Sequence, residues 1–106
     1  MSLERIIKTL IALGLSSVAA ETYVYLAKTG PQTVVDLTKA LNNSKQEINT
    51  GLKILISKRL VTKDRTQMVA LPFEEALELL INQEKKSTKK AKEIKKEYIV
   101  NWNFEK

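Results

Sequence analysis

Five polar side chains on one predicted helix have the chemistry and the spacing that DNA recognition requires. They are Lys45, Gln46, Asn49, Thr50 and Lys53. Lys45, Asn49 and Lys53 are four residues apart, so they line one side of a helix, and the other two flank them. In the major groove Asn and Gln pair with adenine and Lys with guanine, while Lys also neutralises phosphate. The pattern favours a helix that reads double-stranded DNA; the alternative is the ordinary solvated face of a small helix.

A short charged hairpin is predicted to follow this helix. Residues 60–63 and 67–71 have strand character, with a turn of Asp-Arg-Thr between them. Lys63 and Arg65 have the charge needed to contact the DNA backbone, although Asp64 lies between them and lowers the local positive charge. The loop is short and contains no glycine, so we expect phosphate contact rather than deep insertion into the minor groove. The alternative is an ordinary charged hairpin tip.

Two capping patterns predict where the reading helix and the helix before it begin. Thr33 followed by Asp36 is a variant of the capping box, and Ser44 followed by Glu47 is a full capping box. The asparagine pair between the two helices is suited to a tight turn. Two short helices joined in this way predict a helix-turn-helix, in which the second helix, residues 44–59, enters the DNA.

Each of these helices also has an apolar side that predicts its packing against a core. The first helix is expected to bury Val34, Leu37, Ala40 and Leu41, and the second Ile48, Leu52, Leu55 and Ile56. Gly51 interrupts the second helix, where glycine costs about 1 kcal/mol relative to alanine. We therefore expect another helix to cross close to that position.

The two ends of the chain are predicted to form a dimer interface. A helix at residues 2–13 has a wide apolar stripe, and a helix beginning at Phe73 has apolar residues on a heptad-like track. We expect a winged helix-turn-helix domain at residues 1–72 and a long dimerisation helix with coiled-coil character at 73–106. The expected interface residues are Leu3, Ile6, Leu10, Leu77, Leu80, Ile94, Tyr98 and Trp102. For Trp102 the alternative is docking back on its own core.

The charge of the chain favours a polyanionic partner. Net charge is +6, and residues 1–72 hold 10 Lys and Arg against 5 Asp and Glu. The surplus therefore lies in the predicted DNA-binding part, although a basic surface also serves solubility.

Composition excludes several classes of function. The chain has no cysteine and no histidine, which excludes thiol chemistry, histidine catalysis and zinc sites with nitrogen or sulfur ligands. It has no phosphate-binding loop or nucleophile motif, so we expect no enzyme activity, metal or cofactor. No apolar run reaches the roughly 18 residues of a membrane span. We expect a cytoplasmic, nucleoid-associated protein with no evident small-molecule effector.

The combined pattern resembles the winged helix-turn-helix domains of the TrmB-like group of archaeal transcription regulators and, more distantly, MarR-type domains. The motifs that carry the resemblance are Leu13-Gly14-Leu15-Ser16, Ala20 with Tyr23, Gly30-Pro31-x-Thr33, Leu60-Val61 and Ala70-x-Pro72-x-Glu74-Glu75-Ala76-Leu77. The resemblance covers residues 13–80. It implies a mainly α-helical fold, with a three-helix core and a small β-hairpin wing, that binds double-stranded DNA and forms homodimers through its terminal helices.

Two departures limit what the resemblance implies. Arg59 stands where family members commonly have glycine before the wing, and their wing is often longer and contains glycine. Full-length TrmB regulators also carry a large sugar-binding domain, whereas here one predicted helix follows the wing. We therefore do not expect sugar sensing.

Three functions agree with these observations. A dimeric transcription regulator would read the major groove with helix 44–59, contact the backbone with the wing, and prefer a palindromic site over random DNA by on the order of 10³ or more. An architectural chromosomal protein would show little preference and a steep salt dependence. A protein-interaction winged helix would bind an acidic partner and no DNA. The first is the function that we expect.

Overall fold

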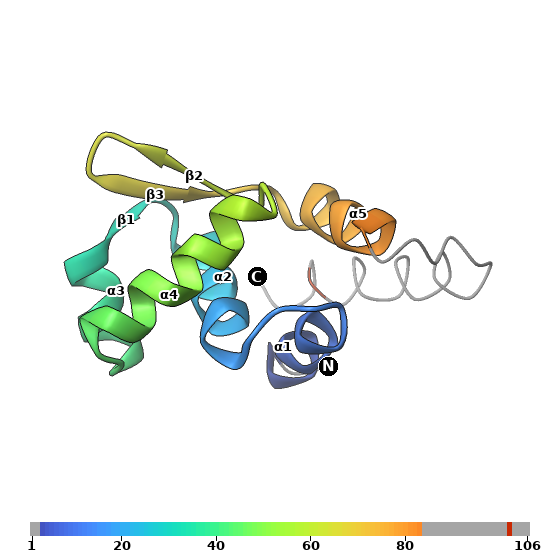
Figure 1. Cartoon of the computed structure of the whole chain (residues 1–106), viewed down its shortest axis with the longest axis horizontal. Coiled ribbons are helices and arrows are strands. Elements are labelled where there is room, and N and C mark those ends of the chain that lie inside the picture. The colour runs from blue at the N-terminus through green and yellow to red at the C-terminus, as the bar shows by residue number, and fades with distance from the viewer. Residues whose placement is uncertain (1–2, 84–101, 103–106) are drawn as a thin grey trace.

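The elements of the chain follow the order helix, helix, strand, helix, helix, strand, strand, helix (Figure 1). The computed structural model describes residues 3–83 and residue 102. The elements are α1 (Leu3–Ala12), α2 (Ser17–Thr29), β1 (Gln32–Thr33), α3 (Val34–Leu41), α4 (Lys45–Ser57), β2 (Val61–Asp64), β3 (Gln67–Ala70) and α5 (Phe73–Gln83). This confirms the mainly helical fold with a small antiparallel sheet, which has the arrangement of a winged helix-turn-helix. The predicted helix beyond residue 83 lies outside the described residues.

Local hydrogen bonds confirm where α3 and α4 begin. The N–H of Asp36 donates to Thr33 Oγ1 (3.2 Å), and the N–H of Thr33 donates to Asp36 Oδ2 (3.4 Å). Ser44 and Glu47 form the same reciprocal pair before α4. Each capping box satisfies backbone donors that the first turn of a helix leaves without a partner. Between the helices Asn42 adopts the left-handed conformation (φ 53°, ψ 38°), which asparagine tolerates better than most residues.

α4 ends in a Schellman motif that leads directly into the wing. The N–H of Leu60 donates to Leu55 O (2.9 Å), and the N–H of Arg59 donates to Ile56 O (3.0 Å). The equivalent pair of bonds closes α1 around Gly14. Both turn residues have positive φ, 111° at Gly14 and 65° at Arg59. Glycine adopts such angles without strain, whereas the left-handed conformation costs another residue roughly 1–2 kcal/mol.

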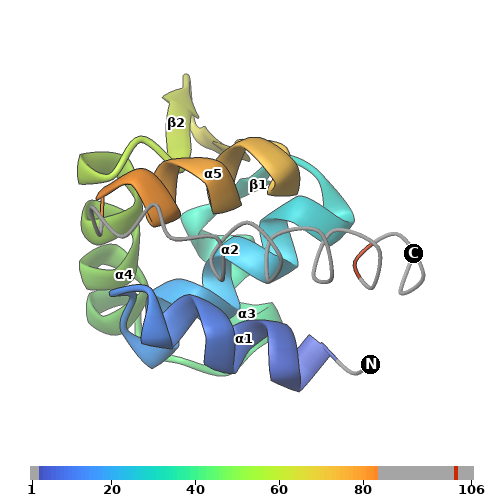
Figure 2. The ribbon, with the colours of Figure 1, turned by 90° about the vertical axis from the view of Figure 1, so that its right-hand side faces the viewer.

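α2 occupies the centre of the core and packs against both α1 and α4 (Figure 2). α4 approaches α2 closely at Gly51, where an added β-carbon would lie 3.2 Å from Val18 Cγ1 and 3.3 Å from Ala19 N. The close crossing predicted at Gly51 is confirmed.

Two residues that were predicted to be buried are exposed. Ile56 is 42% exposed because it lies about a quarter-turn from the side of α4 that faces α2, where Ile48 and Leu52 are buried. Ala40 is exposed because it lies about a quarter-turn from the side of α3 on which Leu37 is buried and Val34 and Leu41 pack against the core. The spacing of apolar residues therefore predicted a wider buried side for α3 and α4 than the structure has.

The three strands form an antiparallel sheet in the order β1-β3-β2. β2 and β3 form the predicted hairpin, which we call the wing; β2 includes Asp64, so the turn consists of Arg65 and Thr66 alone. β1 was not predicted, because a strand of two residues has no periodicity to recognise. It pairs with β3 immediately before α3 begins, and this pairing ties the start of α3 to the wing.

Most of the apolar residues predicted for a dimer interface are buried within the single chain. Ile6, Leu10, Leu77 and Leu80 have 0% exposure, and Trp102 has 6%. Their burial does not require a second chain, and homodimerisation stays a prediction. Ile94, Tyr98 and the side chain of Leu3 lie outside the described part of the structure.

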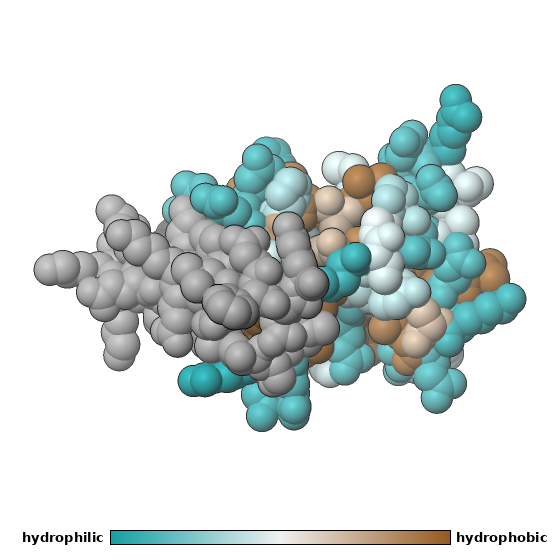
Figure 3. All heavy atoms as spheres, turned by 180° about the vertical axis from the view of Figure 1, so that it is seen from behind, coloured by the Kyte–Doolittle hydropathy of each residue, from teal (hydrophilic) through white to brown (hydrophobic). Residues whose placement is uncertain are grey.

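On the face seen in Figure 3, the visible described surface is mainly hydrophilic with small hydrophobic areas. Among the described residues, the large hydrophobic side chains with substantial exposure are Ile11 (40%), Val35 (58%) and Ile56 (42%). No helix within residues 3–83 has both the length and the apolar character to cross a membrane.

Candidate nucleic-acid interface

A hollow of about 330 Å³ lies between α4, the start of α3 and the wing. Lys45 and Asn49 line it from α4, Lys63 lines it from β2, and Arg65 lines it from the turn of the wing. The remaining lining residues are Thr33, Val34, Val35, Thr66 and Met68. We call this hollow the basic groove. It joins two segments of the sequence that were each predicted to contact DNA.

Strand pairing decides which charges of the wing line the basic groove. Lys63 is opposite Met68 across the hairpin, and both residues line the groove. Asp64 is opposite Gln67, and neither lines it. Successive side chains of a strand point to opposite faces, so the acid next to Lys63 in sequence is directed away from it. Asp64 therefore lowers the positive charge of the groove less than its place in the sequence suggests.

Arg65 occupies a backbone conformation that is usually left to glycine or asparagine. Its φ is 60°, and two-residue hairpin turns of the favoured types require positive φ at this first position. The left-handed conformation costs an arginine roughly 1–2 kcal/mol. Strain of this kind often marks a functional site, and here the strained residue is an exposed cation that lines the basic groove.

Three residues of α4 predicted to contact DNA are exposed but do not line the groove. They are Gln46, Thr50 and Lys53. The hydroxyl of Thr50 donates to the backbone oxygen of Gln46 (2.9 Å). The structure therefore brings together Lys45, Asn49, Lys63 and Arg65, and leaves the other three on the adjoining surface of the helix.

The basic groove also contains residues that sequence reasoning did not select. Thr33 was recognised as a helix cap, but its pairing with Gln67 places it beside the wing. Val35 and Met68 line the groove as well. The pairing of β1 with β3 places the start of α3 beside the wing. A strand of two residues leaves no pattern in the sequence from which this pairing could be predicted.

Comparison with protein-family profiles matches residues 10–74 to the family described as "Sugar-specific transcriptional regulator TrmB". The chain belongs to this family. The match runs from the last turn of α1 through the wing to the start of α5, and it confirms the resemblance seen in the sequence. TrmB proteins are DNA-binding transcription regulators and not enzymes. No curated protein and no solved structure matches the chain.

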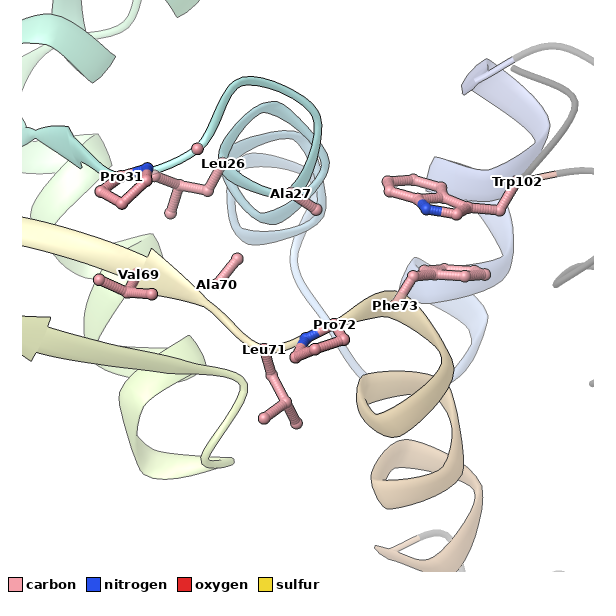
Figure 4. Close-up of a pocket in the computed structure, with 10 residues that line it drawn as sticks. Leu26, Ala27, Pro31, Val69, Ala70, Leu71, Pro72, Phe73 and Trp102 are labelled. Atoms are coloured by element: carbon pink, nitrogen blue, oxygen red, sulfur yellow. The ribbon is translucent and has the colours of Figure 1, made fainter. Parts of the chain in front are cut away.

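A second hollow, of about 320 Å³, lies where the wing of this TrmB domain meets α2 and α5 (Figure 4). Trp102 and Phe73 line it, with their rings stacked at 4.4 Å between centroids. Lys28 Nζ lies 4.2 Å from the centroid of the Trp102 ring. Trp102 thus docks on its own core, the alternative considered above. The described lining contains no charged side chain, so this hollow does not suit a polyanion.

The wing is held to the core at the end of β3. The hydroxyl of Tyr23, a fully buried side chain of α2, donates to Leu71 O (2.5 Å). The N–H of Leu71 donates in turn to Leu60 O (2.8 Å). Burial raises the pKa of Tyr23, and the negative charge of Glu75 raises it further. The neutral phenol is therefore the form that the folded protein favours.

We predict that Tyr23→Phe lowers the free energy of unfolding by about 1–2 kcal/mol, because the Leu71 carbonyl loses its side-chain donor. Urea unfolding at pH 8 measures this. A change below about 0.3 kcal/mol would show that the bond does not hold the wing.

The difference in free energy of unfolding between the wild type and Tyr23→Phe should also depend on pH. Because the folded pKa of Tyr23 is raised, its contribution is complete below the unfolded pKa of about 10 and is lost as the pH rises above it. At pH 11 the stability of the wild type is therefore expected to approach that of Tyr23→Phe. A difference that is the same at pH 8 and pH 11 would contradict this assignment.

Proposed function

We propose that this chain is a homodimeric transcription regulator that inserts α4 into the major groove of double-stranded DNA and contacts the backbone with its wing. The observation that carries the proposal is the basic groove. It combines Lys45 and Asn49 of α4 with Lys63 and Arg65 of the wing in one hollow. Membership of a family of transcription regulators supports the same function.

The side chains divide into two roles on chemical grounds. The amide of Asn49 can pair with the two major-groove atoms of adenine, and Lys45 suits guanine or phosphate. Gln46, Thr50 and Lys53 extend the contact along the exposed side of α4. Lys63 and Arg65 suit phosphates beside the groove that α4 occupies. Contacts from α4 would supply specificity, and contacts from the wing would supply affinity and register.

We expect the binding unit to be a two-fold symmetric homodimer. The two copies of α4 would then be about 34 Å apart, one turn of DNA. Sedimentation of the intact protein should give twice the mass of one chain, and the sites selected from random duplexes should be palindromes with that spacing. A monomer that selects a single half-site would overturn the dimer but leave the DNA contacts intact.

A salt-titrated binding assay on random and selected duplexes tests the function itself. We expect the selected site to bind on the order of 10³-fold more tightly than random DNA. Little difference between them would indicate an architectural protein, and no binding at low salt would indicate a protein-interaction module. In the same assay Lys45→Ala with Lys53→Ala should lower the log–log salt slope by about 2, because each phosphate contact contributes about 0.9.

Lys8→Ala with Lys39→Ala is the matched control, because both lysines are exposed on other helices and outside the groove. This control should leave the salt slope at the wild-type value. Equal slopes for the two double variants would contradict the placement of α4.

The two arginines with positive φ allow a second, sharper comparison. Arg59→Gly and Arg65→Gly each remove one exposed cation and one strained backbone (φ 65° and 60°). Both should raise the free energy of unfolding by about 0.5–1 kcal/mol. This value is the backbone strain that is relieved minus the cost of the greater conformational entropy of glycine in the unfolded chain. Only Arg65 lines the basic groove, so only Arg65→Gly should lower DNA affinity and the salt slope. If both variants lower affinity equally, charge alone governs binding and the wing has no special contact.

A further inference from the structure

Val35 is an exposed aliphatic side chain inside the basic groove. It is 58% exposed, more than Ile11 (40%) or Ile56 (42%), and neither of those lines the groove. The neighbouring Val34 packs against the core, so Val35 is not needed for that purpose. A single exposed aliphatic residue is ordinary on a protein surface. An exposed aliphatic residue within a proposed DNA-binding groove, however, could contact an apolar group of the DNA.

The first turn of α3 holds Val35 in a defined position. The capping box of Thr33 and Asp36 fixes this turn, and Thr33 also pairs with Gln67 of the wing. Valine in a helix has one strongly preferred χ1 rotamer. Its two γ-methyl groups are therefore presented beside the lining residues of α4 with little conformational freedom to lose on binding.

The major groove of DNA offers one apolar group among its donors and acceptors, the 5-methyl group of thymine. Lys45 and Asn49 provide polar contacts in the basic groove, whereas the γ-methyl groups of Val35 have no polar function. We propose, on the basis of the function proposed above, that Val35 contacts the 5-methyl group of a thymine. α3 would then contribute to sequence recognition alongside α4.

The surroundings of Val35 favour this ligand over an apolar protein partner. Three cationic residues, Lys45, Lys63 and Arg65, line the same groove, and an apolar partner would have to desolvate them without compensation. A polyanion that carries a methyl group would neutralise the three cations and also provide an apolar contact for Val35. Packing of Val35 against a deoxyribose is the other DNA contact available, and it would not depend on the methyl group of the base.

A cycle of two proteins and two duplexes tests the proposal. The duplexes are a site selected from a random library by the wild-type protein, and the same site with uracil in place of thymine. The wild type should bind the thymine duplex about fourfold more tightly for each contacted methyl group, the value of burying one such group. Val35→Ala removes the γ-methyl groups and should bind the two duplexes within about a factor of 1.5. Ile56→Ala, an exposed aliphatic residue of α4 outside the groove, should keep the wild-type ratio.

The outcomes separate this proposal from the function on which it rests. A thymine-to-uracil ratio that is the same in wild type and Val35→Ala overturns the contact, even if both proteins bind the site tightly. Failure of the wild type to bind any duplex overturns the proposed function as well. Because Val35 is exposed, Val35→Ala should unfold at the wild-type urea concentration, and this measurement excludes a change in folding as the cause.

Discussion

The two-residue pairing between β1 and β3 is the constraint on which the rest of the interface depends. Thr33 pairs with Gln67 of the wing and also caps α3, so one residue fixes the wing relative to the helix-turn-helix. The bond from Tyr23 to Leu71 holds the other end of β3 against the core. With both ends of β3 fixed, the positions of Lys63 and Arg65 follow from the fold. A hairpin attached only through its connections would leave those cations free to move, and ordering them on DNA would cost conformational entropy.

The fold gathers three cationic side chains from separate segments of the sequence into one hollow. Lys45, Lys63 and Arg65 line one hollow, while the nearest acid in the sequence, Asp64, does not. Arg65 adds backbone strain to this arrangement. This strain lowers the stability of the isolated chain by a small amount. Three cations in one hollow, one of them in a strained turn, support the proposed binding of a polyanion.

Features determined by local chemistry were predictable from the sequence, and those determined by distant contacts were not. The capping boxes at Thr33 and Ser44 involve residues three apart, and the structure has both. The close crossing at Gly51 followed from the cost of glycine within a helix. Ile56 was assigned to the core because spacing alone does not give the direction from which α2 approaches.

The same distinction applies to the candidate site. Lys45, Asn49, Lys63 and Arg65 were selected by residue type and spacing. β1 was missed because two residues carry no pattern, and Val35 was missed with it because its place in the groove depends on how α3 sits against the wing. The positions of β1 and Val35 depend on contacts with the wing, which is distant from them in the sequence.

The docking of Trp102 also determines the optical properties of the protein. It is the single tryptophan of the chain, and its ring is buried, stacked on Phe73 and close to the ammonium group of Lys28. Tryptophan emission therefore comes from one environment, the junction between α2, α5 and a residue near the C-terminus. That junction shares no lining residue with the basic groove. The protein thus carries a built-in fluorophore that reports the docking of Trp102 separately from the occupancy of the groove.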